Sequence, residues 1–299
     1  MYSSTNDVRT IWITGGAGFL GRRLTRELSG KGSKVVSLSR RTSPDADESI
    51  AIDLVSGAHK LQQLLDAEGP PDVVVHAASR QPGRFSFKEF VAGNVITTQN
   101  LLDALRTTPP RQIIYTSTLS VYSRSSDLPL TEKHPASHAE PYGATKRWAE
   151  QLMESFKESQ ISILRLPSLY GRGQADSFID GLATLALKNE TIDLFSRGRT
   201  IRDALHVSDV VTAIGNCIQH TAEKQCVLMN LGCGRPIPTI EYARALVEAF
   251  ESRSTITESD RESSHFDAYA SISLANQLIG FEPTELKESL RIYANELRS

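Results

Sequence analysis

The chain has 299 residues, of which 39% are hydrophobic, and a formal net charge of −2. A nearly neutral balance gives no broad electrostatic case for binding nucleic acid or an anionic membrane. No apolar run approaches the length of a bilayer span, and residues 1–10 are polar, so neither a membrane helix nor a signal-peptide core is expected. The three cysteines lack CxxC spacing, which argues against a disulfide framework or a zinc site and favours reduced thiols in a cytoplasmic protein.

The first predicted element is a strand over 10–14, which runs into a glycine-rich loop and a helix over 19–29. Gly15 suits a tight turn with positive φ, Gly18 lets the backbone approach a pyrophosphate, and Gly21 lets the helix pack closely on the sheet. The N-terminus of a helix favours anions through its free N–H groups and its dipole. The spacing GxxGxxG in this strand-loop-helix context therefore predicts a dinucleotide-binding loop.

Short apolar runs alternate with longer amphipathic stretches along the rest of the chain. Further strands are predicted near 34–38, 72–75, 111–117 and 161–165, and further helices over 58–67, 87–106, 142–158, 176–188, 208–220, 239–250 and 284–297. This alternation is typical of a parallel sheet covered by helices on both faces. We expect residues 206–220 to return as a strand and helix to the main sheet, and the polar stretch 251–264 to form a loop over a substrate cleft.

The second strand ends in a sequence that favours NADP(H) over NAD. Sheets that prefer NAD usually carry an acidic residue here, which binds the adenine ribose hydroxyls. This chain has Ser39 and Arg40 instead, a hydroxyl and a cation that suit a 2′-phosphate, with Arg22 or Arg41 as helpers. The alternative is a solvated basic loop that leaves NAD acceptable. At the end of the next strand, His76 is expected to pack or hydrogen-bond locally rather than to act as a base.

The pair Tyr142 and Lys146 lies four residues apart on a predicted helix, so the two side chains share one face. A free phenol with a pKa near 10 is a poor base at neutral pH, and a neighbouring ammonium together with a positively charged nicotinamide favours the phenolate and lowers that value. The lysine is also placed to hydrogen-bond the nicotinamide ribose and fix the geometry of hydride transfer. A Tyr-x-x-x-Lys pair alone is common, so its weight comes from the glycine loop earlier in the chain.

These two motifs, TGGAGFLG from Thr14 and YGATK from Tyr142, resemble the extended short-chain dehydrogenase/reductase family, which includes nucleotide-sugar epimerases, dehydratases and ketoreductases. The resemblance covers nearly the whole chain and implies an α/β, Rossmann-type doubly wound parallel sheet with a smaller C-terminal substrate-binding subdomain. It places a dinucleotide-binding domain at 1–165 plus about 205–222, and the substrate-binding subdomain at 166–204 and 223–299. It also implies a homodimer that pairs through the helices at 87–106 and 142–158.

The resemblance assigns roles to individual residues. Thr118 is the catalytic hydroxyl beside Tyr142 and Lys146, and Ser117 is the neighbour with which it could be confused. The residues implied at the cofactor are Gly15, Gly18, Phe19, Leu20, Gly21, Ser39, Arg40, Asp53, Leu54, Ala77, Ala78, Asn94, Thr116, Tyr142, Lys146 and Pro167, and those at the substrate are Ser117, Thr118, Ser168, Arg202 and Arg261. Ser168 replaces the family's usual Asn, and no metal ligand set is implied.

The implied reaction is NADPH-dependent reduction of a 4-keto nucleotide sugar, with Tyr142 as general acid. The alternative is a 4-epimerase that oxidises the sugar transiently with tightly bound NAD(P). Dehydratases carry an Asp-Glu pair after the Thr, where this chain has Leu119 and Ser120, which argues against dehydration. A small-carbonyl reductase and a non-catalytic NADP-binding regulator are less favoured, the latter because Thr118, Tyr142 and Lys146 are all retained.

Overall fold

The computed structural model describes residues 10–137, 140–174, 177–220 and 225–298. The polar residues 1–9 and residue 176, predicted as the start of a helix, lie outside these ranges. The chain forms two compact units. Unit 1 comprises Met1–Ser123, Pro135–Arg165 and Val211–Met229, and unit 2 comprises Arg124–His134, Leu166–Val210 and Asn230–Ser299. In the described residues, no helix is long and apolar enough to cross a membrane.

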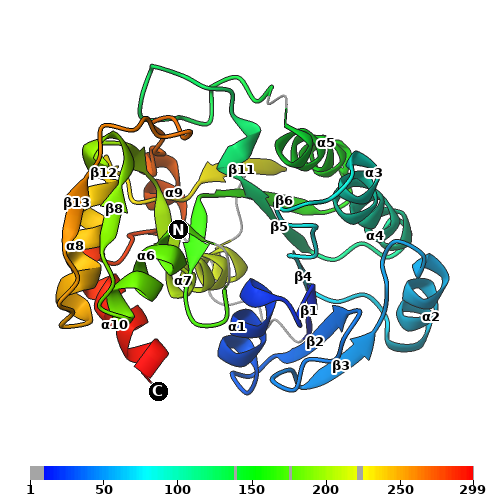
Figure 1. The fold of residues 1–299 in the computed structure, drawn as a ribbon. Coiled ribbons are helices and arrows are strands. Elements are labelled where there is room, and N and C mark those ends of the chain that lie inside the picture. The colour runs from blue at the N-terminus through cyan, green and yellow to red at the C-terminus, as the bar shows by residue number, and fades with distance from the viewer. Residues whose placement is uncertain (1–9, 138–139, 175–176, 221–224, 299) are drawn as a thin grey trace. The chain divides into compact units, whose positions relative to one another are not determined.

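Unit 1 is built on a seven-stranded sheet with the strand order β11-β6-β5-β4-β1-β2-β3 (Figure 1). The strands are β1 (Thr10–Thr14), β2 (Lys34–Ser39), β3 (Glu48–Ala51), β4 (Val73–His76), β5 (Gln112–Thr118), β6 (Gln160–Leu166) and β11 (Cys226–Asn230). Their central members are apolar and buried on both faces, as in parallel sheets covered by helices. The pairs β1–β2, β1–β4, β2–β3 and β4–β5 run parallel.

The strand order reverses between β1 and β4, which is the switch point of a doubly wound sheet. The register aligns Thr14 at the end of β1 with His76 at the end of β4, and His76 with Tyr115 in β5. The loops that follow these parallel strands therefore open at the same edge of the sheet. Ligands of open α/β sheets bind at this edge, beside the switch point.

Helices cover both faces of this sheet. The helices of unit 1 are α1 (Phe19–Leu28), α2 (Ala58–Glu68), α3 (Phe87–Phe90), the π-helix η1 (Val91–Ile96), α4 (Thr97–Leu105), the short 3-10 helix η2 (Leu119–Val121) and α5 (Pro141–Ser155). The helix α7 (Val207–Gln219) contributes its residues from Val211 onward. In Figure 1, α1 and α7 lie on one side of the sheet, and α2, α4 and α5 lie on the other. The predicted helix 87–106 is a single run interrupted by η1.

Unit 2 combines short strand pairs with four helices. The pairs are β7 (Ser168–Tyr170) with β10 (Ala204–His206), β9 (Ile201–Arg202) with β12 (Ile237–Pro238), and β8 (Ile192–Leu194) with β13 (Ile256–Glu258). The helices are α6 (Phe178–Leu187), α8 (Thr239–Ala249), α9 (Ser273–Ile279) and α10 (Leu286–Arg298), and the 3-10 helix η3 (Phe195–Gly198) follows β8. A core centred on Tyr170, Tyr242 and Tyr293 is buried among α6, α8 and α10.

The structure corrects three expectations. The strand predicted near 206 is β10, which pairs with β7 in a separate two-stranded sheet and not in the main sheet. The main sheet is instead extended by β11, which lies in a stretch that was assigned to the substrate-binding subdomain. The stretch 251–264 contains β13, so it is not a plain loop. Strands of three to five residues carry too little periodicity to separate them from loops.

Candidate active site

The glycine loop between β1 and α1 is shaped by its missing side chains. Gly15 has φ of +71°, and a Cβ there would lie 2.8 Å from the Ala78 nitrogen. At Gly21 a Cβ would lie 2.1 Å from the Gly15 oxygen, so helix and loop touch through backbone alone. Gly18 is the N-cap of α1 and offers no side-chain cap to the free N–H groups of the first turn.

This geometry fits the pyrophosphate of a dinucleotide. The first turn of α1 presents uncapped N–H groups and the positive end of the helix dipole, and Gly18 is exposed. Phe19 and Leu20, which form that turn, are partly buried. Ala77 and Ala78 follow β4 as small, partly buried residues, and their N–H groups bond to the carbonyl and hydroxyl of Thr14, respectively. The residues present can therefore hold the phosphates between two loops at the carboxyl edge of the sheet.

His76 is a structural residue, as the sequence predicted. Its Nδ1 lies 2.7 Å from the Thr14 hydroxyl and its Nε2 lies 3.0 Å from the Thr98 hydroxyl. Burial, assisted by the nearby charge of Lys146, lowers the pKa of His76 to about 3, so the ring stays neutral at physiological pH. Its ring stacks on Tyr115 at 5.5 Å. This chain of hydrogen bonds fixes β1, β4 and α4 around the cofactor loop.

Tyr142 stands at the start of α5 and meets Thr118 at the end of β5. Burial raises the pKa of Tyr142 to about 12, and a hydrogen bond with the Thr118 hydroxyl acts in the opposite direction. The same hydroxyl oxygen accepts the Ser120 N–H at 3.1 Å, which orients it. In the chain by itself, loss of solvation dominates and raises the pKa of Tyr142, whereas the expected lowering also involves the positive charge of a bound nicotinamide. Without further positive charge, Tyr142 is a neutral phenol.

Lys146 is buried one turn further along α5, with only 2% of its surface exposed. Its Nζ donates a 2.6 Å hydrogen bond to the Thr116 carbonyl and lies 4.3 Å from the centre of the Tyr115 ring. Burial lowers the pKa of Lys146 to about 7, and the charge of Glu150 partly offsets this. An amine with such a pKa keeps a substantial ammonium fraction at neutral pH and can still donate to a ribose hydroxyl.

Thr118, Tyr142 and Lys146 lie together at the carboxyl edge of the sheet. A phenol in this position can give a proton to, or accept one from, an oxygen atom that also lies within reach of the Thr118 hydroxyl. The nicotinamide dinucleotide that the glycine loop fits would supply a hydride acceptor and donor when bound. The oxidised ring of such a cofactor would add positive charge that favours the phenolate of Tyr142, which is the state needed to remove a proton.

Two predicted contact residues are used by the protein itself. The Asn94 side chain accepts the Arg80 N–H at 2.7 Å and donates to the Thr145 hydroxyl at 3.0 Å, and it is 1% exposed. It therefore joins the loop after β4 to α5 from within η1. The Ser117 hydroxyl is buried and donates to Glu150 at 2.5 Å, so the structure gives it a partner inside the protein.

The residues expected near the adenine ribose lie at the ends of β2 and β3. The Ser39 hydroxyl donates to the Arg41 carbonyl at 2.5 Å, and Arg40 is exposed beyond the strand. Asp53 is exposed and accepts the Val55 N–H at 3.0 Å, while Leu54 is 5% exposed in the core. The guanidinium of Arg40 is thus available to an anion from solvent.

Unit 2 carries most of the predicted substrate residues. Arg202 in β9 lies over the Phe178 ring at 4.4 Å, and burial lowers its pKa. Its neighbour Asp203 accepts the N–H groups of Cys233 at 2.8 Å and Ala270 at 2.9 Å. Burial raises the pKa of Asp203 to about 6. Asp203 thus ties three segments of unit 2 together, and Arg202 is held against an aromatic ring beside it.

The remaining predicted residues of unit 2 differ in their partners and in their burial. Arg261 pairs with Asp193 and lies 5.0 Å from the centre of the Phe195 ring, so its guanidinium already has an anionic partner. Ser168 begins β7, is partly buried, and donates its backbone N–H to the Asp203 carbonyl at 3.3 Å. Pro167, just before it, is partly buried.

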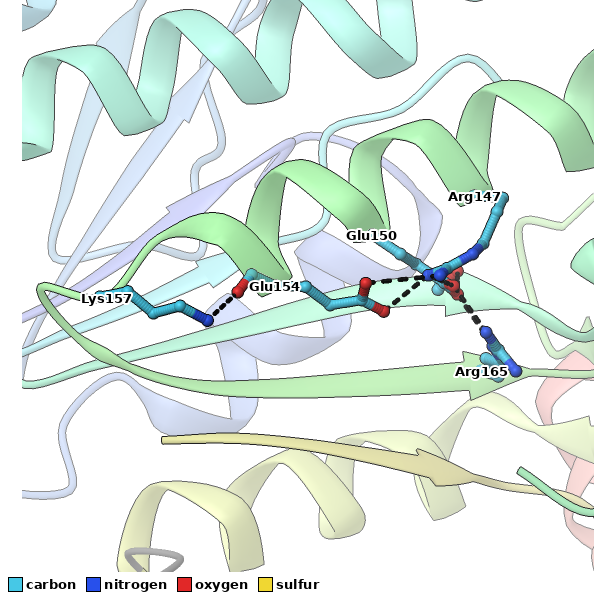
Figure 2. A network of polar contacts seen from close by, with 6 residues as sticks. Arg147, Glu150, Glu154, Lys157 and Arg165 are labelled. Atoms are coloured by element: carbon cyan, nitrogen blue, oxygen red, sulfur yellow. Dashed lines mark hydrogen bonds and ion pairs between the residues drawn. The ribbon is translucent and has the colours of Figure 1, made fainter. Parts of the chain in front are cut away.

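Glu150 and Arg165 are functional candidates that sequence reasoning missed. Glu150 is fully buried in α5 and is held by Arg165 of β6 and by Ser117 (Figure 2). The available signal was the spacing, since Tyr142, Lys146 and Glu150 recur every four residues on one helix face. This spacing predicts that Glu150 lies on the same face of the helix as Tyr142 and Lys146, toward the sheet.

The cradle for a dinucleotide and the Tyr-Lys-Thr group define an enzyme that transfers hydride on a nicotinamide cofactor. Comparison with known families identifies the class of enzyme more closely. The family model for the NAD dependent epimerase/dehydratase family matches residues 11–232. The chain therefore belongs to the NAD-dependent epimerase/dehydratase family, as its resemblance to the extended short-chain dehydrogenases implied.

Similar proteins agree with this family along nearly the full length. The low-salt glycan biosynthesis protein Agl12 of Haloferax volcanii is 27% identical, covering 91% of this chain and 93% of that protein. A putative UDP-glucose 4-epimerase of Methanocaldococcus jannaschii is 26% identical, covering 97% and 98%. The solved structure of MoeE5 in complex with UDP-glucose and NAD superposes with a TM-score of 0.83 at 29% identity, covering 97% and 98%. The similarity extends to the Rossmann-type fold.

Proposed function

We propose that this enzyme is a nucleotide-sugar 4-epimerase that oxidises C4 of a sugar transiently and reduces it again on the other face. The observation that carries this function is the meeting of Thr118, Tyr142 and Lys146 at the carboxyl edge of the sheet that bears the glycine loop. Relatives named as UDP-glucose and UDP-glucuronate 4-epimerases support this choice over the simple ketoreductase that the sequence favoured.

In each turnover, Tyr142 would take one proton from the sugar and later return it. Tyr142, as phenolate, would remove the proton of the C4 hydroxyl, and a nicotinamide cofactor held by the glycine loop would supply the hydride acceptor needed to convert C4 to a ketone. Thr118 donates a hydrogen bond to the same oxygen and stabilises its charge. After the ketone turns over, hydride returns to the opposite face of C4 and Tyr142 gives the proton back. No net oxidant or reductant is consumed.

Unit 2 carries the other residues proposed to bind a nucleotide sugar. Arg202 suits a diphosphate because a guanidinium recognises phosphate oxygens bidentately. Arg261 would have to exchange Asp193 for a phosphate, so we give it the weaker role. Ser168 would contact the sugar. Dehydration remains disfavoured, since the two residues that follow Thr118 in η2 carry no carboxyl group.

The decisive experiment combines cofactor identification with sugar analysis. Freshly purified protein is denatured, and any released nicotinamide cofactor is identified by mass spectrometry. The native protein is then incubated with UDP-glucose, UDP-glucuronic acid or UDP-N-acetylglucosamine, and C4 configuration is followed by NMR. Inversion without net NAD(P)H consumption supports the epimerase. Stoichiometric NADPH oxidation with a 4-keto sugar, and no inversion, would instead establish the ketoreductase.

The identity of the cofactor is a separate proposal. Arg40 lies exposed beyond β2, and no carboxylate stands at Ser39, which together support NADP(H). We expect Arg40→Ala to raise the KM for NADPH on the order of tenfold and to change that for NADH little, because only NADPH carries the 2′-phosphate. Arg26→Ala, at the far end of α1, is the control. Equal effects of Arg40→Ala on both cofactors would show that NADP(H) is not preferred.

A homodimer through the helices of unit 1 is supported by two exposed aromatic side chains. Phe87 of α3 is 50% exposed and Trp148 of α5 is 44% exposed, and their rings meet edge to face at 5.9 Å. We expect Trp148→Glu to convert a dimer into a monomer in light scattering at micromolar concentration, since a charge buried in an apolar interface is costly. A wild-type protein with monomeric mass would refute the dimer.

The compartment is proposed from the cysteines. Cys217, Cys226 and Cys233 are all free, and burial raises the pKa of each thiol, which makes it unreactive. Free thiols of this kind persist in a reducing environment. We therefore place the enzyme in the cytoplasm, where localisation of a tagged chain would test the assignment.

A further inference from the structure

Glu150 is a buried carboxylate that the proposed chemistry does not use. It lies in α5, one turn beyond Lys146 and two turns beyond Tyr142, and its surface is 0% exposed. A buried charge is tolerated only when it is paired and hydrogen-bonded, because its desolvation costs several kcal/mol. The partners of Glu150 therefore show how its buried charge is compensated and which segments it connects.

Both carboxylate oxygens of Glu150 are engaged. Arg165 of β6 binds it bidentately, through Nε at 2.9 Å to Oε1 and through one terminal nitrogen at 2.7 Å to Oε2. The Ser117 hydroxyl donates to Oε1 at 2.5 Å. Arg147 reaches Oε2 at 3.0 Å from the outer side and continues to Glu154. Figure 2 shows the carboxylate of Glu150 between the guanidinium of Arg147 and that of Arg165.

The bond from Ser117 is one of three that join the end of β5 to α5. The Thr116 carbonyl accepts from Lys146 at 2.6 Å, Ser117 donates to Glu150, and Thr118 bonds to the Tyr142 hydroxyl. Three consecutive strand residues thus contact three successive turns of the helix. The bonds of Thr116 and Thr118 reach Lys146 and Tyr142 of the proposed catalytic group. The bond of Ser117 reaches the carboxylate of Glu150, which Arg165 holds against β6.

We propose that Glu150 is a positioning residue that, through Ser117, holds the end of β5 in register with α5 and so sets the Thr118–Tyr142 hydrogen bond. The bidentate ion pair to Arg165 makes the anchor rigid, since a guanidinium fork fixes the orientation of a carboxylate. Glu150 also acts through its charge, which raises the pKa of Lys146 against the larger lowering by burial.

A merely structural ion pair would behave differently. It would hold α5 against the sheet, and weakening it would lower stability without a specific effect on Tyr142. Positioning instead predicts that Tyr142 responds when the Ser117 bond is lost and the Glu150–Arg165 pair remains. Glu150→Gln leaves Arg165 buried without an anion and is expected to unfold easily. Ser117→Ala is therefore the informative variant.

The test compares Ser117→Ala with Arg147→Gln, which removes the outer partner of the same carboxylate. The protein is labelled with 13Cζ-tyrosine, and the resonance of Tyr142 is assigned by its absence from Tyr142→Phe. We expect this resonance to shift in Ser117→Ala, as the Thr118 bond loosens, and to stay in place in Arg147→Gln. The NMR measurement needs no substrate, so it remains informative if the proposed function fails.

The kinetic readout rests on the proposed function. Ser117→Ala should lower kcat about tenfold to a hundredfold, the range for misplaced catalytic groups, while KM for the nucleotide sugar changes less than about twofold. An unmoved Tyr142 resonance with only a lowered Tm would overturn the proposal in favour of a structural ion pair. A raised KM with unchanged kcat would overturn it as well and would assign Ser117 to the substrate.

Discussion

Replacing Tyr142 with Phe is expected to lower kcat by about 10²–10⁴-fold, the range for loss of a general acid-base group. The phenol stands at the start of α5 with its hydroxyl bonded to Thr118, and Phe retains the ring contact with Phe90 at 6.1 Å. The fold and the glycine loop should therefore be preserved. Turnover of a nucleotide sugar and the affinity for NAD(P), by calorimetry, are measured in parallel.

The pH dependence gives the same prediction a second test. Burial holds the pKa of Tyr142 at about 12 in the cofactor-free protein, so oxidation of the sugar must await a phenolate. The rate of that half-reaction should fall as the pH falls through the pKa of Tyr142 in the complex, because the protonated phenol cannot accept a proton. Tyr142→Phe should abolish this dependence. A variant with full activity and an unchanged profile would move the acid-base role to another group.

Much of the cofactor end could be predicted from sequence because its chemistry is local. The glycine loop follows a buried strand and opens a helix, and its motif occupies the continuous segment from Thr14 to Gly21. Tyr142 and Lys146 share one helix, so their common face follows from spacing alone. That His76 packs and forms hydrogen bonds inside the protein could also be predicted from its place at the end of a buried strand, although its partners Thr14 and Thr98 lie 62 and 22 residues away in the sequence.

Other features depend on packing between distant segments. Ser117 and Thr118 are adjacent hydroxyls, and only the position of Glu150, 33 residues away from Ser117, separates their roles. The pKa of Tyr142 depends on how completely the folded chain removes water, which no motif encodes. The strand β11 was missed because Cys226–Asn230 is short and joins the sheet beyond β6, across a large separation in sequence.

The glycines of the loop allow binding and stability to be separated. In Gly21→Ala the added Cβ would lie 2.1 Å from the Gly15 oxygen and 2.7 Å from the Gly16 Cα. These neighbours are backbone atoms that cannot rotate away, so the loop or α1 must shift. We expect the free energy of unfolding to fall by about 1–3 kcal/mol, as for overpacked sites, and the affinity for NAD(P) to be lost together with it. Chemical denaturation and calorimetry measure the two effects.

Gly18→Ala is the matched control for this prediction, because it should weaken cofactor binding with a much smaller loss of stability than Gly21→Ala. Gly18 has φ of −80° and ψ of 176°, which alanine adopts freely, and its added Cβ would lie 3.0 Å from the Gly15 oxygen. This contact is tight but much less severe than the one at Gly21, and alanine is a poorer N-cap than glycine, so the free energy of unfolding should fall by about 1 kcal/mol or less. The Cβ would, however, stand where the pyrophosphate approaches the first turn of α1, so affinity should fall on the order of tenfold or more. If Gly18→Ala binds NAD(P) as the wild type does, the first turn of α1 does not hold the phosphates, and the cradle must be sought elsewhere at the carboxyl edge of the sheet.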